Sequence, residues 1–283
     1  MTTITRDSAT SDPSPQSNGL STGTPTVRAF LSDVPSPDGR CHVGVITLNR
    51  PEKRNALREQ ECRGVARAVK SLLAKNVRAI LITGEGPVLS AGADLSGGVY
   101  GADFGATSME MLRAITQAPV PVIADVFGPA IGAGCQMILA CDLRIFGDEG
   151  ECWILSARHG FALDEWTHRR AVELMGGAWA RNLFIGGDHL GAAEARTIGF
   201  SMDARGRTAE EFAAKVAGQA PISMNHSKLM LNRESERIAD APAGHDEGSR
   251  KIGELFKLAW ASEDAAEARA ARQEKRAPKF EGR

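Results

Sequence analysis

Two glycine-rich segments carry the residues best suited to chemistry: SAGADL at 90–95 and GPAIGAGCQ at 128–136. Each follows an apolar, strand-like run, so each is expected where a strand gives way to a helix. Backbone N–H groups at such a junction lack partners and, together with the helix dipole, can hold a negatively charged oxygen. Neither segment has the spacing of a dinucleotide motif or a P-loop. On spacing alone, tight turns that need glycine for packing explain the segments equally well.

The elements that must position these segments follow from hydrophobic periodicity. Short, nearly all-apolar runs at 43–49, 77–83, 120–126 and 143–146 predict the buried strands of a parallel sheet. A helix is expected to open near Asn55, and helical patterns dominate after residue 146, at 169–176, 192–198, 208–218, 226–238, 249–260 and 263–275. The sequence therefore predicts an α/β core over 27–206 and a helical region over 207–283. Residues 1–26, rich in Ser, Thr, Pro and Gly, are expected to form a flexible tail.

Composition narrows the classes of partner. The 34 basic and 35 acidic residues give a formal net charge of −1, which offers no overall attraction to nucleic acid or to an anionic membrane. The five cysteines form no CxxC pair and no zinc spacing, so no metal site is expected. No apolar run approaches the roughly 20 residues that span a bilayer, and no signal-like N-terminus is present, so a cytoplasmic location is expected.

Three segments in order, TLNRPEKRNAL (47–57), ILITGEGPVLSAGADL (80–95) and VFGPAIGAGCQMILACDLRI (126–145), resemble the crotonase, or enoyl-CoA hydratase/isomerase, superfamily. The resemblance runs from about Val43 to EKRAPKF at 274–280. It implies a crotonase (ClpP/crotonase-like) fold with a repeated ββα spiral core and a C-terminal helical trimerisation region. It also implies a homotrimer or hexamer that binds fatty acyl-CoA or enoyl-CoA, with no cofactor besides the CoA of the substrate.

The resemblance also suggests site residues. The backbone N–H groups of Ala91 and Ala133 would hold the thioester oxygen, and the main-chain donor survives alanine at 133 if its backbone angles suit a Cβ. The CoA moiety would be contacted by Arg50, Lys53, Arg54, Ala93, Asp94 and Leu95, and near a neighbouring subunit's nucleotide by Lys279 and Phe280. The alternatives are solvated charge for the three cations, a loop-holding role for Asp94, and a frayed end for the last two residues.

The resemblance fails at the glutamate pair that the family's hydratases use. Gln136 stands at the first position and about Ser156 at the second, although Glu149 or Glu151 remains open as a displaced carboxylate. Loss of a general acid or base costs about 10²- to 10⁴-fold per group. The best remaining acid or base is Asp164, in HGFALDEW at 159–166, and the alternative is that it caps a helix. His159 and His168 are assigned no catalytic role.

AIGAGCQ, GFALDEW and EKRAPKF together resemble an actinobacterial branch of the superfamily, named as enoyl-CoA hydratases, that lacks the glutamate pair. We therefore expect a fatty acyl-CoA binding protein of fatty acid metabolism with weak or altered hydratase or isomerase activity. The alternative is a non-catalytic acyl-CoA carrier that works with a partner lipid-synthesis enzyme. A scaffold that keeps only the fold is a third hypothesis.

Overall fold

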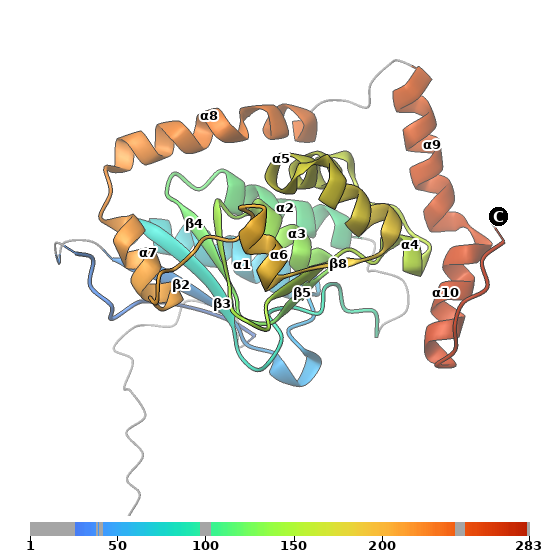
Figure 1. Ribbon diagram of the computed structural model, residues 1–283, viewed down its shortest axis with the longest axis horizontal. Coiled ribbons are helices and arrows are strands. Elements are labelled where there is room, and N and C mark those ends of the chain that lie inside the picture. Colours follow the sequence, from blue (N-terminus) through green and yellow to red (C-terminus); the bar gives the residue numbers. More distant parts are fainter. Residues whose placement is uncertain (1–25, 38, 40–41, 97–102, 241–246, 282–283) are drawn as a thin grey trace, which may run out of the picture.

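Two β-sheets form the centre of the molecule (Figure 1). The structure is a computed structural model that describes residues 26–37, 39, 42–96, 103–240 and 247–281. The larger sheet has the order β1-β2-β3-β4-β6, with strands at Val27–Leu31, Val43–Leu48, Ala79–Gly84, Val122–Val126 and Leu143–Phe146. Strands β2, β3, β4 and β6 are parallel, and β1 pairs antiparallel with β2. The predicted parallel sheet is confirmed.

The smaller sheet supplies the second strand of each repeat. It contains β5, β7 and β8, at Pro129–Ile131, Glu151–Trp153 and His189–Gly191. The pairing of β5 with β7 is parallel, and parallel bridges join Ser90 to Ala130 and Leu57 to Ala93. Successive units thus place one strand in the large sheet, a second in this layer, and then a helix. The expected repeated ββα core of an α/β fold is confirmed.

Helices cover both faces of the large sheet, which explains why its strands are apolar throughout. On β2, Ile46 and Leu48 pack into the cluster beneath α1 (Glu59–Leu73), α2 (Phe104–Thr116) and α3 (Ala133–Ala140). Val43 and Val45 alternate to the opposite face, where they pack against α7 (Ala209–Ala217). Helix α7 is therefore packed as part of the layered core, although it lies beyond residue 206.

The start of α1 differs from the prediction. The helix begins at Glu59, and a 3-10 turn at Pro51–Lys53 precedes it. Arg54 and Asn55 have φ values of 51° and 52°, in the left-handed region that a helix does not use. The buried Asn55 amide donates to the carbonyl oxygens of Glu85 and Val88, each at 2.9 Å, and so ties this loop to the one after β3. The left-handed conformation of Asn55 therefore occurs in the residue whose side chain holds the two loops together.

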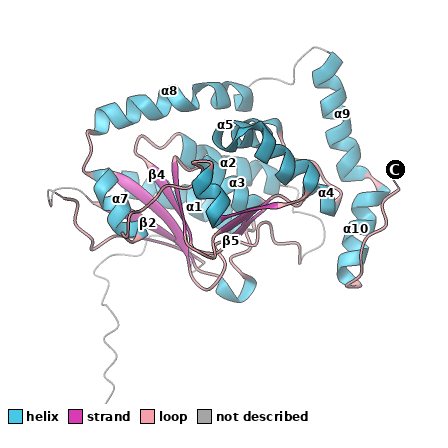
Figure 2. Ribbon diagram, in the orientation of Figure 1, coloured by secondary structure: helices cyan, strands magenta, loops and turns pink. Residues whose placement is uncertain are grey.

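The remaining helices are α4 (Ser156–His159), α5 (Glu165–Arg181), the π-helical turn η2 (Asn182–Gly186), α6 (Ala192–Thr197), α8 (Pro221–Asp240), α9 (Glu247–Ala261) and α10 (Glu263–Gln273). Helices α5 to α10 follow the predicted stretches, whereas α2, α4 and η2 were not predicted. Helices α6 to α10 follow the last strand, and Figure 2 shows α9 and α10 together at one side of the molecule. The predicted tail lies outside the described residues except for Thr26. Among the described residues, no helix is both long and apolar enough to cross a membrane.

Candidate functional site

The two glycine-rich segments lie directly against each other. Ser90 N donates to Pro129 O at 3.2 Å, and Ile131 N donates to Ser90 O at 2.9 Å. Gly92 has φ of 85°, and a Cβ at this position would lie 2.5 Å from the carbonyl oxygen of Ile131. Only glycine combines that conformation with that approach. The packing role of this glycine is confirmed, and it places residues 91–93 beside the start of α3.

The start of α3 presents unpaired N–H groups, because the first N–H groups of a helix have no intrahelical acceptor. Gly132 caps the helix with φ of 53°, so the left-handed residue is the glycine. Ala133 is not among the residues with positive φ, and its Cβ is therefore accommodated. Within the described residues, no group accepts a hydrogen bond from the Ala133 N–H.

The first predicted donor requires a correction. The Ala91 N–H donates to the carbonyl oxygen of Arg54 at 2.8 Å and is not free for a ligand. Ala93, two residues later, lies between two residues that pair with Leu57. Gly92 O accepts from the Leu57 N–H, and the Asp94 N–H donates to Leu57 O, so the Ala93 N–H points to the side away from Leu57. No described group accepts from the Ala93 N–H. The free pair is therefore Ala93 and Ala133.

Two adjoining cavities meet at Ala93. Their volumes are about 430 and 690 Å³, within the range of small-molecule sites. Ala133 lines the larger cavity. Both cavities are lined by Arg54, Ala91, Ala93, Leu95, His159, Phe161, Trp260 and Arg272. The shared lining makes them two compartments of one site.

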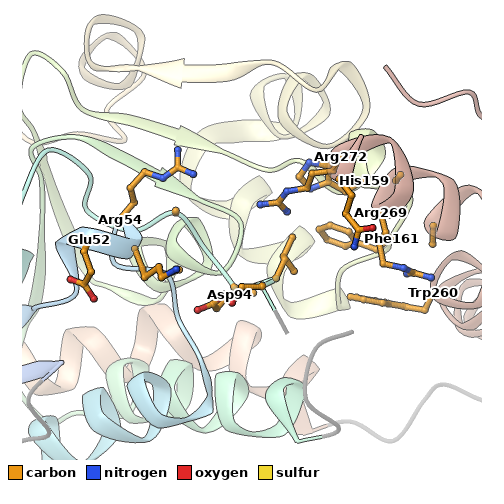
Figure 3. A pocket seen from close by; sticks show the side chains of 17 residues that line it. Glu52, Arg54, Asp94, His159, Phe161, Trp260, Arg269 and Arg272 are labelled. Atoms are coloured by element: carbon orange, nitrogen blue, oxygen red, sulfur yellow. Dashed lines mark hydrogen bonds between the residues drawn. The ribbon is translucent and has the colours of Figure 1, made fainter. Parts of the chain in front are cut away.

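The smaller compartment is rich in cations. Figure 3 shows Glu52, Arg54 and Asp94 on one side and, across from them, His159, Phe161, Trp260, Arg269 and Arg272. Lys53 also lines this compartment. Four guanidinium or ammonium groups here outnumber the two carboxylates, and one of those carboxylates is neutralised by an arginine of another loop. The compartment therefore suits a polyanion.

That neutralised carboxylate belongs to Asp94, which is paired with Arg50. The guanidinium lies 2.6 Å from Asp94 Oδ2 and also donates to Ala56 O at 3.2 Å. Burial would raise the pKa of Asp94, but hydrogen bonds from Ser96 and Arg50 outweigh it and hold that pKa well below its usual range. The loop-holding interpretation of Asp94 is confirmed. Arg50 is buried and lines neither compartment, in contrast to Lys53 and Arg54.

The larger compartment is mainly apolar. Its walls come from the sheet edge, from α2 and from α9, which is far away in sequence. The Trp260 indole donates to Ala162 O at 3.0 Å, and its ring stacks on Phe161 with centroids 5.2 Å apart. The apolar lining consists chiefly of Phe104, Met109, Leu112, Leu155, Leu163, Phe256 and Trp260.

Gln136 and Asp164 meet on the wall of the larger compartment, together with Thr167. The Gln136 Nε2 donates to Thr167 Oγ1 at 2.7 Å and to Asp164 Oδ2 at 3.1 Å. Asp164 also accepts from the Thr167 N–H at 2.9 Å and from its hydroxyl at 2.8 Å. Asp164 is therefore the N-cap of α5, as the alternative interpretation predicted. Because the Gln136 nitrogen is committed to these acceptors, its amide oxygen is the atom left for a ligand.

The other residues considered for the glutamate pair lie off the site. Ser156 begins α4 and is buried, and the Glu151 carboxylate accepts from the Trp153 indole at 2.8 Å. Glu149 is exposed, and none of the three lines either compartment. Among the described residues, Asp164 is the one carboxylate that lines the larger compartment.

Lys279 and Phe280 are not brought to this site within one chain. Lys279 lines a separate hollow beside α10, where its backbone N–H donates to Glu267 at 2.8 Å, and Phe280 is 43% exposed. Their predicted contact with a neighbouring subunit's nucleotide stays a prediction.

The residues that the sequence alone did not indicate come from α2, α4, α9 and α10. One signal was available, because Ala265, Ala268, Arg269 and Arg272 follow the i, i+3, i+4, i+7 spacing of one helix face. All four line the smaller compartment. Periodicity in the sequence does not predict which cavity such a helix face will line.

Comparison with known proteins decides the family. The family model described as enoyl-CoA hydratase/isomerase matches residues 39–283. The chain belongs to the enoyl-CoA hydratase/isomerase family. It is 37% identical over 243 residues to "Probable enoyl-CoA hydratase echA6" of Mycobacterium tuberculosis, covering 84% of this chain and 95% of that protein. The Mycobacterium leprae protein of the same name is 38% identical over 250 residues, covering 85% and 96%.

Solved structures agree with this family. The crystal structure of enoyl-CoA hydratase/isomerase from Pseudoalteromonas atlantica T6c has a TM-score of 0.71 at 29% identity, covering 84% of this chain and 96% of that one. Methylmalonyl-CoA decarboxylase in complex with 2-nitronate-propionyl-CoA has a TM-score of 0.76 at 22% identity, covering 90% and 98%, and so shares the fold. The enoyl-CoA hydratase/isomerase resemblance and the crotonase fold are confirmed.

Proposed function

We propose that this member of the enoyl-CoA hydratase/isomerase family binds fatty acyl-CoA thioesters with the carbonyl oxygen between the N–H groups of Ala93 and Ala133. The observation that carries the proposal is this pair of unpartnered donors at the junction of a cationic and an apolar compartment. The CoA phosphates would lie among Lys53, Arg54, Arg269 and Arg272, and the acyl chain would lie between α2 and α9.

Hydratase chemistry would be weak or altered. Hydration of an enoyl thioester needs a group that removes a proton from water and one that delivers a proton to carbon. The Gln136 amide can orient a water through its oxygen but does not exchange protons at useful rates. The Asp164 carboxylate already accepts three hydrogen bonds. A proton-transfer role for Asp164 therefore stays a prediction.

The alternative is a non-catalytic acyl-CoA carrier that presents its ligand to a lipid-synthesis enzyme. The same engagement of Gln136 and Asp164 in a capping network favours this alternative, because it leaves the usual glutamate positions without a proton carrier. Robust turnover of any enoyl-CoA would exclude it, and recovery of a partner enzyme with bound acyl-CoA would support it.

Substitution of Ala133 by proline tests the oxyanion site directly. Proline is tolerated at the first position of a helix, where it replaces the N–H that we assign to the ligand by a ring carbon. Ala133→Pro should weaken octanoyl-CoA binding by at least about tenfold, the net value of one hydrogen bond, and should lower any enolate-forming turnover by about 10²-fold or more.

The matched control is Ala133→Ser, which keeps the N–H at the same position. Titration calorimetry would measure affinity, and the enoyl absorbance of crotonyl-CoA and of a long trans-2-enoyl-CoA would measure hydration. Equal affinity in Ala133→Pro and Ala133→Ser would remove Ala133 from the site. Micromolar binding with no hydration in the unmodified protein would favour the carrier.

A further inference from the structure

The last residue of the short helix α4 presents a titratable ring where the two compartments meet. His159 lines both compartments, together with Ala93, Phe161 and Arg272. Figure 3 shows its ring beside Phe161 and Arg272. Within the described residues, no group hydrogen-bonds the imidazole, whereas the Asp164 carboxylate is fully engaged. Its ring nitrogens are therefore available to a bound molecule.

The helix explains why His159 reaches the site and Ser156 does not. The two residues are three positions apart on α4, so they lie on neighbouring parts of one helix face. Ser156 is buried under that face, and the longer side chain one turn later extends to the compartments. Helix α4 thus brings a titratable side chain to both compartments at position 159 and none at position 156.

The surroundings of His159 favour the neutral form of the ring. Burial lowers the pKa of His159, and the charges of Arg272 on α10 and Arg158 on α4 lower it further. Residues 182–186 of the adjoining η2 carry no titratable side chain. Arg54 and Asp164 are the other charged groups that line the larger compartment. A neutral imidazole in a site built to hold an oxyanion is a base ready to accept a proton.

We propose that His159 is a catalytic base that exchanges the C2 protons of a bound acyl-CoA thioester. A neutral ring nitrogen takes one proton from C2, and the C–H bonding pair becomes the C1–C2 double bond of an enolate. The carbonyl pair moves to the oxygen held by Ala93 and Ala133. The imidazolium then exchanges its proton with solvent and returns a proton to C2, so no other reactant is needed.

This inference rests on the proposed function, and deuterium exchange separates the two. Octanoyl-CoA would be incubated with the protein in D₂O, and deuterium at C2 would be followed by mass spectrometry, beside a calorimetric titration of the same ligand. We expect exchange in the unmodified protein and a loss of about 10²-fold or more in His159→Gln, with affinity changed less than threefold. His189→Gln, on a ring stacked on Trp153 outside both compartments, is the matched control.

The possible results distinguish the catalytic proposal from the binding proposal. Octanoyl-CoA binding without exchange in the unmodified protein, or full exchange in His159→Gln, overturns the role of His159 and leaves the binding proposal standing. Failure to bind octanoyl-CoA overturns both. Should His159→Gln lose its fold or its affinity, the pH profile of the unmodified protein decides. The rate of deuterium exchange must rise with pH through a pKa below the usual histidine value and reach a plateau by neutral pH. A profile without this rise refutes the proposal.

Discussion

At the scale of single residues, Gly92 has the most restrictive surroundings in the site. Its φ of 85° is one that side chains rarely adopt, and its neighbour is the backbone oxygen of Ile131, which cannot move aside cheaply. Because this contact sets the spacing between the Ala93 and Ala133 donors, any added Cβ must separate the two segments. The spacing between the two segments is thus set by a backbone contact.

Gly92→Ala is therefore expected to lower both stability and affinity. A residue forced into that conformation costs about 1–3 kcal/mol, and displaced donors should weaken octanoyl-CoA binding by about tenfold. Chemical denaturation and titration calorimetry measure the two effects. Gly253→Ala in α9, where a Cβ would meet nothing within 4 Å, is the control and should be neutral or slightly stabilising. Unchanged binding in Gly92→Ala would show that the segment spacing does not matter to the ligand.

At the scale of elements, the junction of α3 with α5 determines what the wall of the larger compartment presents. The N-cap of α5 fixes Asp164, and Asp164 with Thr167 fixes the amide of Gln136 on α3. One carboxylate thus ends a helix and orients a neighbour's side chain. Its structural and chemical roles can be separated, because asparagine caps a helix as well as aspartate does.

Asp164→Ala should cost about 1 kcal/mol or more of unfolding free energy, whereas Asp164→Asn keeps the cap and should cost less, through the loss of the acceptor that Gln136 and Thr167 share. If Asp164 also transfers protons, Asp164→Asn should abolish turnover of enoyl-CoA and leave affinity nearly intact. Urea denaturation and the enoyl absorbance assay measure these effects, with the exposed Asp148→Asn as control. Unchanged turnover in Asp164→Asn would restrict the residue to capping.

At the scale of the whole molecule, the C-terminal helices close the site that the core begins. Trp260 and Phe256 of α9 and Arg269 and Arg272 of α10 line cavities whose other walls come from residues 52–164. Figure 1 shows α9 and α10 beyond α4 at one edge of the core, and α10 contacts α4. The cationic compartment therefore depends on helices outside the ββα repeats.

Binding of CoA thioesters should accordingly weaken as ionic strength rises, because salt screens the exposed cations of this compartment. Arg269→Gln should weaken octanoyl-CoA binding by up to about fivefold at low salt, the value of an exposed charge pair, and should flatten the salt dependence. Arg67→Gln, on the exposed side of α1, should change neither. Affinities at several salt concentrations test this, and a salt-independent affinity would place the phosphates elsewhere.

The sequence by itself determined the fold and most of the site's main-chain frame. Short apolar runs alternating with helical patterns predict a covered parallel sheet, and glycine segments after two of them mark where the backbone comes close. The family resemblance carried by these segments predicted Ala133, Lys53, Arg54, Gln136 and Asp164 as residues of one site, and the structure places all five on its walls. It also allowed both the capping and the catalytic interpretation of Asp164.

Tertiary structure alone decided which N–H groups and which side chains are free. Pairing with Arg54 removes the Ala91 N–H and leaves that of Ala93, and pairing with Asp94 withdraws Arg50 from the cavity. Helices α4, α9 and α10 contribute His159, Trp260 and Arg272 to the lining of the larger compartment. These outcomes depend on contacts between segments that are distant in sequence. A local pattern of residue types does not determine which partner each N–H group or side chain will contact.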